Sequence, residues 1–428
     1  MKTRVRPTDQ SRPLLERLFL ARGEDATSIA RPLNLADLLS PTSMKGIDGA
    51  ADILADAVRS NTPTIVAGDF DADGAGSAAV AIIGLRAMGL TNVDYIIPDR
   101  ITQGYGLSPA IAEAAAATGA KLLITVDNGI SSIEGVKRAR SLGLITLLTD
   151  HHLAPDVLPD ADVIVNPNQP GCSFASKNLS GCGVIFYVLL AARAKLNAAK
   201  WFDSSGIPYP NLANLIDLVA LSTVGDLVKL DRNNRTLVAH GLRLIRQGRS
   251  RPGMNALFQV AGSNPADAMS SHFGFTLCPR LNGAGRIDDM RIGVECLIAG
   301  DDQTAMRHAA TLNDINQRRR DMQKNMTETA IDLTTAVEVR PGMVLHSPEF
   351  HQGIVGLIAT KMKDSHYRPT IVFADAEDGK IKGSGRSIPG FHIRDALALI
   401  QSMPDSPIIT MGGNTRDGLR PFNQEGPS

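Results

Sequence analysis

Acidic residues and histidines directly follow three short apolar runs in this chain of 428 residues. The run 64–68 leads into Asp69, Asp71 and Asp73. The run 122–126 leads into Asp127, and the run 144–149 leads into Asp150, His151 and His152. Carboxylates this close together repel one another unless a cation neutralises them. The spacing therefore predicts a site for divalent metal.

The elements that must position these residues alternate between strand and helix. Strand-like runs are expected at 64–68, 93–97, 122–126, 144–148 and 162–165. Ala-rich stretches with helical spacing separate them, at 75–89, 108–118 and 131–142. This alternation predicts an α/β fold with a parallel sheet. Because such sheets bind ligands beyond the carboxyl ends of their strands, the acidic motifs stand where a site is expected.

The three alternating aspartates would share one side of an extended chain, and Gly74-Ala75-Gly76 permits a turn into the next helix. The alternative is a surface turn rich in Asp and Gly. Asp226 ends a further apolar stretch at 215–224. Alone, such a residue more often caps a helix than binds metal. Together with the other motifs it completes a ligand set.

The two adjacent histidines are the more specific signal. Neighbouring side chains on a regular strand point to opposite faces, so only a strand-end position aims one histidine at metal. The other is then available as a general acid or a substrate contact, and Asp127 can bridge two cations. Carboxylate and imidazole ligands suit Mn²⁺ or Mg²⁺. Two such ions about 3.5–4 Å apart promote phosphoester hydrolysis, so the residues predict a two-metal phosphoesterase.

The length of the chain implies two or three domains. Residues 181–200 and 211–224 are expected to form buried helices, and a new strand-and-helix pattern begins at Gly342. The expected divisions are an N-terminal segment at 1–45, a catalytic domain at 46–235, a helical connector at 236–335 and a second, smaller α/β domain at 336–428.

Composition points to a cytoplasmic enzyme without a membrane segment. Forty-four basic residues balance 44 acidic ones, so no net charge favours a polyanionic partner. The densest local cluster, Arg318-Arg319-Arg320, is either a nucleic-acid contact or a solvated helix face. The four cysteines lack Cys-x-x-Cys spacing and are expected to be reduced thiols of the core. We expect no signal sequence and no apolar run of about 20 residues.

An Asp-x-Asp motif, a later Asp, an Asp-His-His triplet and a final Asp, in this order, resemble the DHH phosphoesterase family. Five segments are similar to the single-strand-specific 5′→3′ DNA exonucleases of that family: 68–79, 98–107, 125–132, 149–152 and 278–290. The resemblance covers nearly the whole chain from about residue 14. It implies a metal-dependent exonuclease of DNA repair and recombination, with single-stranded DNA as substrate and single-strand-binding protein and helicases as partners.

The same resemblance implies roles for individual residues. The expected metal ligands are Asp69, Asp71, Asp73, Asp127, His151 and Asp226, with Asp69 the more peripheral member. His152 would lie at the scissile phosphate as the catalytic histidine, Asp150 would orient its neighbours, and Asp127 would serve the reaction through the metal.

Six further residues are expected to bind the strand: Tyr105, Arg280, Asn282, Arg286, Ser384 and Arg386. Two arginines in a small-residue loop at 278–290 suit a phosphate backbone; the alternative is a salt bridge to Asp288 or Asp289. The Gly/Ser turn at 383–387 suits a 5′-terminal phosphate, or is an ordinary turn. Tyr105 would stack on a base, or is a packed aromatic.

The C-terminus departs from the family pattern. Asn414 follows Gly412-Gly413 where the DHH-associated domain normally has His, and the tail contains no oligonucleotide-binding barrel. The sequence therefore predicts a shortened chain with a weaker grip on single strands. Two alternatives to the exonuclease remain open: a phosphodiesterase on short oligonucleotides or cyclic dinucleotides, and an inactive, truncated nucleic-acid-binding module.

Overall fold

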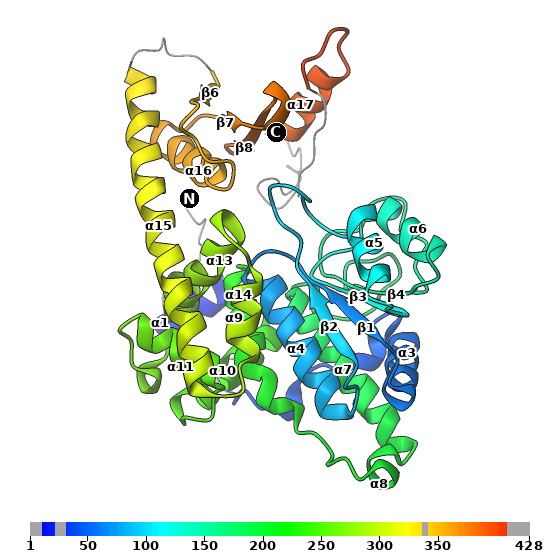
Figure 1. Cartoon of the computed structure of the whole chain (residues 1–428). Helices are drawn as coiled ribbons and strands as arrows, with labels where there is room; N and C mark the ends of the chain where they lie inside the picture. Colours follow the sequence, from blue (N-terminus) through cyan, green and yellow to red (C-terminus); the bar gives the residue numbers. More distant parts are fainter. Residues whose placement is uncertain (1–10, 22–30, 336–340, 409–428) are drawn as a thin grey trace. The chain divides into compact units, whose positions relative to one another are not determined.

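The computed structural model describes residues 11–21, 31–335 and 341–408 (Figure 1). These residues form two compact units. The first runs to Gly285 and includes Asp289–Asn313; the second contains Arg286–Asp288 and the chain from Asp314 onward. The interval 236–335, expected as a connector, is thus divided between the two units. The motif around Asn414 lies outside the described residues.

The first unit contains the expected parallel sheet. Its strands are β1 (Thr64–Ala67), β2 (Val93–Ile96), β3 (Leu122–Val126), β4 (Ile145–Thr149) and β5 (Val163–Val165), in the order β2-β1-β3-β4-β5. Every neighbouring pair is parallel. β1 and β3 are buried along their whole length, as is usual for central strands of a parallel sheet whose two faces are both covered. The α/β prediction is confirmed.

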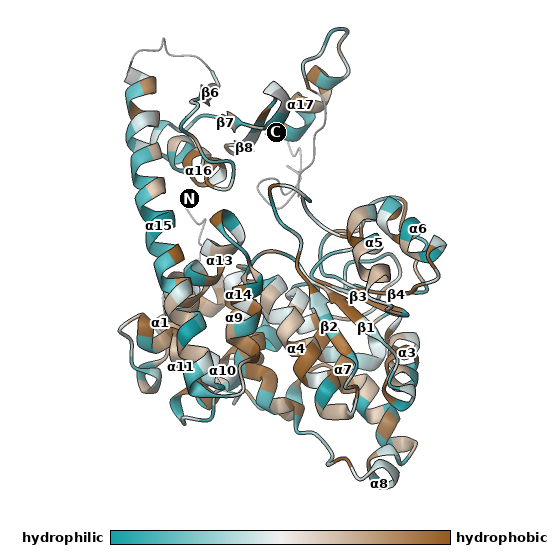
Figure 2. Cartoon of the chain, viewed as in Figure 1, coloured by the Kyte–Doolittle hydropathy of each residue, from teal (hydrophilic) through white to brown (hydrophobic). Residues whose placement is uncertain are grey.

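Helices cover the sheet on both faces. Ile65, Leu123 and Leu148 of the strands form one core with α5 (Pro109–Ala117) and α6 (Ile133–Ser141). The Ala-rich α4 (Ala72–Met88), buried along most of its length, packs against α7 (Gly181–Ala198) and α9 (Ile216–Gly225). α3 (Ile47–Ser60) packs on α7 as well. The hydrophobic colouring of β1 and β3 in Figure 2 reflects this double cover.

Helix α7, expected from the sequence as a buried helix, has the length and apolar composition of a membrane span. Most of this helix is buried inside the first unit, against α3, α4 and α9. Such burial is typical of the core helix of a globular unit.

The remainder of the first unit is mainly helical. It contains α1 (Leu14–Ala21), α8 (Trp201–Ser205), α10 (Arg232–Arg246), α11 (Pro252–Val260), α12 (Ser270–His272), α13 (Cys278–Ile287, its last two residues in the second unit) and α14 (Arg291–Ile298). The prediction of a loop at 278–290 is wrong for most of that range, because α13 occupies residues 278–287. The buried side chains of Cys278, Leu281 and Ala284 recur at helical spacing, which favours a helix despite two glycines.

The second unit is the expected smaller α/β part. It combines the end of the long helix α15 (Asp302–Thr335) with β6 (Met343–His346), α16 (Val355–His366), β7 (Thr370–Asp375), β8 (Ile381–Arg386) and α17 (Ile393–Gln401). β7 pairs with β6 in parallel and with β8 antiparallel. Met326 and Ala330 of α15 pack on Ile358 of α16 and Val372 of β7.

Candidate metal centre

The acidic motifs meet at the carboxyl edge of the five-stranded sheet. Asp69, Asp127 and Asp150 follow the ends of β1, β3 and β4, and these three strands are neighbours. Asp226 arrives at the same place as the residue that ends α9. Carboxylate and imidazole atoms of this cluster lie within 4.8 Å of one another in three groups. The structure thus brings together all six residues predicted as metal ligands.

The first motif is not an extended strand, so the expected alternation of its three aspartates is wrong. Helix α4 begins at Ala72, and Asp71 is its N-cap. Oδ1 of Asp71 accepts hydrogen bonds of 2.9 Å from the backbone N–H groups of Asp73 and Gly74. Capping gives an acceptor to N–H groups that have no partner within the helix, and it places Asp73 in the first turn. Only one oxygen of Asp71 is used in this way, so the other remains available to a cation.

The N-terminus of α7 holds the third aspartate. Asp73 Oδ2 accepts from the N–H of Gly181 at 2.7 Å, and Oδ1 accepts from that of Cys182 at 3.0 Å. A Cβ at position 181 would lie 2.7 Å from both Cα and Oδ1 of Asp127, so only glycine fits there. Asp127 itself has a left-handed backbone, with φ of 61°. Sequence reasoning missed Gly181; the Ser-Gly pair opening an apolar helical stretch was the available signal.

His151 presents its Nε2 atom to three carboxylates. Its Nδ1 donates to the carbonyl oxygen of Leu179 at 2.8 Å. Nε2 lies 2.8 Å from Asp127 Oδ1, 3.6 Å from Asp226 Oδ2 and 3.8 Å from Asp73 Oδ2. In the neutral ring the Nδ1 proton leaves a lone pair on Nε2. A lone pair and several carboxylate oxygens converging on one point make a ligand set for a cation.

Two of the three groups consist of predicted metal ligands alone, and Asp127 joins them. One contains Asp73, His151 and Asp226, and the other contains Asp69, Asp71 and Asp127. Asp127 belongs to the second group, and its Oδ1 lies 2.8 Å from Nε2 of His151 in the first, so this carboxylate reaches both groups. Among the described residues, Oδ1 of Asp69 and Oδ1 of Asp127 are buried without a hydrogen-bond donor. These oxygens fit one or two hard divalent ions such as Mn²⁺ or Mg²⁺.

Burial of like charges dominates the electrostatics of this cluster. Desolvation, reinforced by neighbouring carboxylates, raises the pKa of Asp69 and of Asp127 well above the usual range and the pKa of Asp71 above it. The same causes, burial first and then Asp226 and Asp71, raise the pKa of Asp73 to about 8. Without a cation, protons would have to neutralise these groups near neutral pH.

Asp150 behaves in the opposite way. Burial alone would raise its pKa, but the hydrogen bond from His152 and the nearby histidine charges lower it to about 2. Oδ1 accepts from Nδ1 of His152 at 2.7 Å and from two backbone N–H groups, while Oδ2 accepts from Ile130. Both oxygens are therefore occupied. This arrangement suits a residue that orients His152 better than a metal ligand.

Tyr105 contacts the second histidine. Its hydroxyl lies 3.1 Å from Nδ1 of His152 and 3.3 Å from the carbonyl oxygen of Asp127. The ring also packs edge-on against Phe70 and His152, yet Tyr105 remains 51% exposed. The structure thus ties Tyr105 to the histidine, and stacking on a base stays a prediction.

The other predicted strand contacts have structural partners. Arg280 is only 8% exposed and donates to the carbonyl of Thr276 at 2.6 Å and to Asn313 at 3.1 Å. Asn282 Oδ1 accepts from the N–H of Ala72 at 2.7 Å and so supports the start of α4. Their roles toward a substrate stay predictions.

The remaining three residues lie in the second unit. Arg286 donates to Gly353 at 3.3 Å, and Arg386 donates to the hydroxyl of Ser384 at 3.1 Å. A Cβ at Gly356 would lie 3.0 Å from that hydroxyl and 3.3 Å from Nη2 of Arg386. Ser384 and Arg386 therefore converge beside the first turn of α16.

Two family profiles match the chain: "DHH family, N-terminal domain" over residues 63–223 and "DHHA1 domain" over residues 338–414. The chain is 46% identical to the single-stranded-DNA-specific exonuclease RecJ of Salmonella typhimurium, over 94% of this chain and 70% of that protein. Identity to the Escherichia coli RecJ is 45%, with the same coverage. The chain belongs to the RecJ family.

Solved RecJ structures share its fold. An exonuclease RecJ bound to manganese superposes with a TM-score of 0.73 at 28% identity, covering 84% of this chain and 86% of that one. The Mn²⁺ complex of RecJ from Thermus thermophilus gives 0.73 at 27% identity, covering 90% of this chain and 53% of that one. The cluster at the sheet edge therefore occurs in a RecJ fold.

Gly181→Ala should weaken metal binding in this RecJ-family chain. The added methyl group forces Asp127 away from its place between the two ligand groups. Disturbing a group that supports a metal ligand typically costs about 10- to 100-fold in affinity. Calorimetric titration of Mn²⁺ into folded protein measures this. Gly183→Ala is the matched control on the same helix, because its Cβ would meet only the side chain of Leu179, at 3.2 Å. Equal Mn²⁺ affinity of wild type and Gly181→Ala would contradict the prediction.

Chelator-treated protein should be more stable at pH 5.5 than at pH 8. The pKa of Asp73 is about 8 in the folded protein and near 3.8 when unfolded, so the folded state binds more protons between these values. Stability therefore falls as pH rises, by on the order of 1–3 kcal/mol for one such group. Thermal melts across this range test the slope, and Asp73→Asn should flatten it. Mn²⁺ should stabilise the protein more at pH 8 than at pH 5.5, where protons compete for the ligands; a larger gain at pH 5.5 would refute this account.

Proposed function

We propose that this RecJ-family chain is a metal-dependent exonuclease of the cytoplasm that degrades single-stranded DNA 5′→3′ in DNA repair and recombination. The observation that carries the proposal is the largely buried cluster in which His151 and five aspartates converge at one sheet edge. The relatives named above are single-stranded-DNA-specific exonucleases, and solved RecJ structures hold manganese or magnesium. Family resemblance implies single-strand-binding protein and helicases as partners.

The chain's own groups divide the work. Asp73, His151 and Asp226 would hold one ion and Asp69 and Asp71 a second, with Asp127 between them. Bound there, divalent ions would supply an activated water and neutralise charge on the phosphate.

His152 is the proton-transfer group of the proposal. Asp150 holds its Nδ1 at 2.7 Å, which fixes the ring, and its side chain is 14% exposed at the edge of the cluster. From there the histidine can contact the scissile phosphate and move a proton to or from a reacting oxygen.

Labelled single-stranded DNA, duplex DNA, dinucleotides and cyclic dinucleotides, each with Mn²⁺ or Mg²⁺, test this function. We expect mononucleotides from the single strand. Asp127→Ala should reduce kcat by at least about 10³-fold, and His152→Ala by about 10²- to 10⁴-fold. Asp156→Asn is the control. Asp156 is an exposed carboxylate that, like His152, follows β4, and its replacement should leave the activity unchanged. Cleavage confined to dinucleotides or cyclic dinucleotides would replace the proposal, and an active His152→Ala would remove His152 from it.

Arg386→Gln should affect recognition of the 5′ end. Ser384 and Arg386 converge beside the first turn of α16, where hydroxyl, guanidinium and backbone N–H groups suit a terminal phosphate. We expect about a 10-fold higher KM for 5′-phosphorylated strands and little change for strands with a 5′-hydroxyl. Arg394→Gln, an exposed arginine of the same unit, is the control. An equal change for both kinds of end would exclude end recognition by Arg386.

A further inference from the structure

The run Arg318-Arg319-Arg320 separates into three different environments on α15. Arg318 forms an ion pair with Asp288 at 2.7 Å. Arg319 donates to Asn316 at 2.6 Å and to Gln323 at 2.8 Å. Arg320 instead lines a pocket. The metal centre described above uses none of these residues, so the pocket at Arg320 calls for its own explanation.

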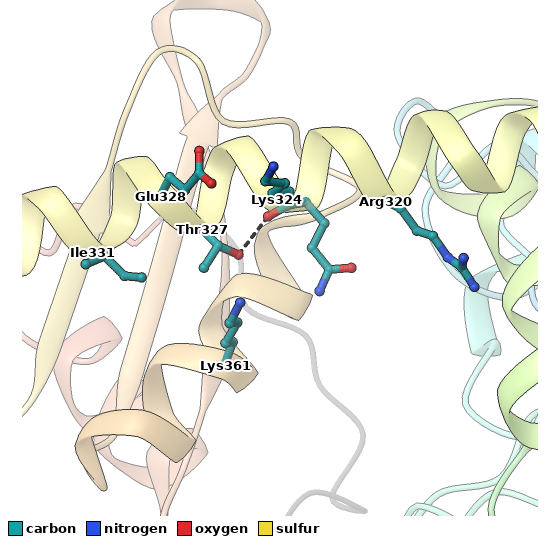
Figure 3. Close-up of a pocket in the computed structure, with 7 residues that line it drawn as sticks. Arg320, Lys324, Thr327, Glu328, Ile331 and Lys361 are labelled. Atoms are coloured by element: carbon teal, nitrogen blue, oxygen red, sulfur yellow. Dashed lines mark hydrogen bonds between the residues drawn. The ribbon is translucent and has the colours of Figure 1, made fainter.

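The pocket lies between two helices of the second unit and has a volume of about 400 Å³ (Figure 3). Its lining residues are Arg320, Gln323, Lys324, Thr327, Glu328 and Ile331 on α15, and Lys361 on α16. Positions 320, 324 and 328 are four residues apart and therefore share one face of the helix. The long helix thus presents a row of charged side chains to the pocket.

Positive charge dominates this lining. The lining includes three cationic side chains, Arg320, Lys324 and Lys361, and a single carboxylate, that of Glu328. All three cations are exposed, and within the described part of the chain none of them forms an ion pair or side-chain hydrogen bond. Nearby arginine and lysine charges without partners repel one another, so a bound anion lowers the free energy of the group.

The shape of the lining favours an extended polyanion. Arg320 and Lys324 are one helical turn apart and Lys361 approaches from the other helix, so the charges are spread out rather than focused on one point. Thr327 uses its hydroxyl within the helix by donating to the carbonyl of Gln323 at 2.7 Å. No aromatic ring lines the pocket on which a base could stack.

We propose that this pocket binds the phosphate backbone of single-stranded DNA, as a contact separate from the metal centre and independent of base sequence. The identity of the strand as DNA rests on the proposed function. We expect the pocket to contribute to the affinity for the strand and to processivity, and not to the hydrolytic step. Phosphate contacts of this kind position a strand without reading it.

The test combines variants that remove positive charge from the pocket with one that removes its negative charge. Fluorescence anisotropy with a long labelled oligothymidylate, in chelator so that no cleavage occurs, measures binding over a series of salt concentrations. The triple variant Arg320→Gln/Lys324→Gln/Lys361→Gln should bind at least about 10-fold more weakly and lose about 2 from the slope of log affinity against log salt, since each lost single-strand phosphate contact accounts for about 0.7. Glu328→Gln should bind about threefold more tightly, which a folding defect would not produce.

Matched controls separate the pocket from overall charge. Lys121→Gln/Lys137→Gln/Lys200→Gln removes three exposed cations of the first unit and should leave the salt slope unchanged. With metal present, the pocket variants should cleave dinucleotides at the wild-type rate but release fewer nucleotides per encounter from long strands.

The outcomes separate the two proposals. If the wild-type protein cleaves single strands but the triple variant keeps the wild-type salt slope, the pocket assignment is wrong and the proposed function stands. Absence of single-strand cleavage by wild type with Mn²⁺ overturns the proposed function, and the salt slope in chelator then still decides the pocket. Inorganic pyrophosphate distinguishes a small-anion site: if the triple variant loses pyrophosphate binding but keeps strand binding, the DNA assignment is wrong.

Discussion

The structure of the first unit depends on the repulsion among carboxylates buried at one sheet edge. Asp69, Asp73 and Asp127 are out of water, which disfavours their charged forms, and each also lies in the field of neighbouring carboxylates. Two backbone N–H groups from α7 stabilise Asp73, and the start of α4 stabilises Asp71. Even so, the pKa of Asp73 remains near 8. The fold alone does not compensate the charge, so a divalent cation completes the folded centre as well as its chemistry.

This constraint explains why the core helix α7 matters to the site. Its apolar body is buried against α3 and α4, while its first residue approaches Asp127 so closely that a side chain has no room. Packing of that body therefore sets the position of the amides that hold Asp73. A small displacement of α7 would move two ligands at once, which couples the stability of the unit to metal affinity.

Patterns local in the chain could be predicted from the sequence, and contacts between distant segments could not. Asp127 and His151 were found because parallel strands deliver their carboxyl ends to one edge. One local feature was missed as well: Asp71 caps α4, and the start of that helix at Ala72 was not evident from the sequence. Arg280 looked like a surface phosphate contact, but the side chain is only 8% exposed and donates to Asn313, which is 33 residues away in the chain. Gly181 is 108 residues from the aspartate that it supports, a pairing that no local pattern encodes.

Although the net charge of the chain is zero, two regions carry opposite local charge. The acidic cluster is buried and draws cations into the sheet edge, whereas Arg320, Lys324 and Lys361 are exposed. Burial makes the first field strong over short distances, because the surrounding medium screens it little; exposure to salt makes the second weak and adjustable. A hydrolase of nucleic acid benefits from this division. Tight metal ligation keeps the reacting groups fixed, while screened contacts to phosphates can be broken and remade as the strand advances.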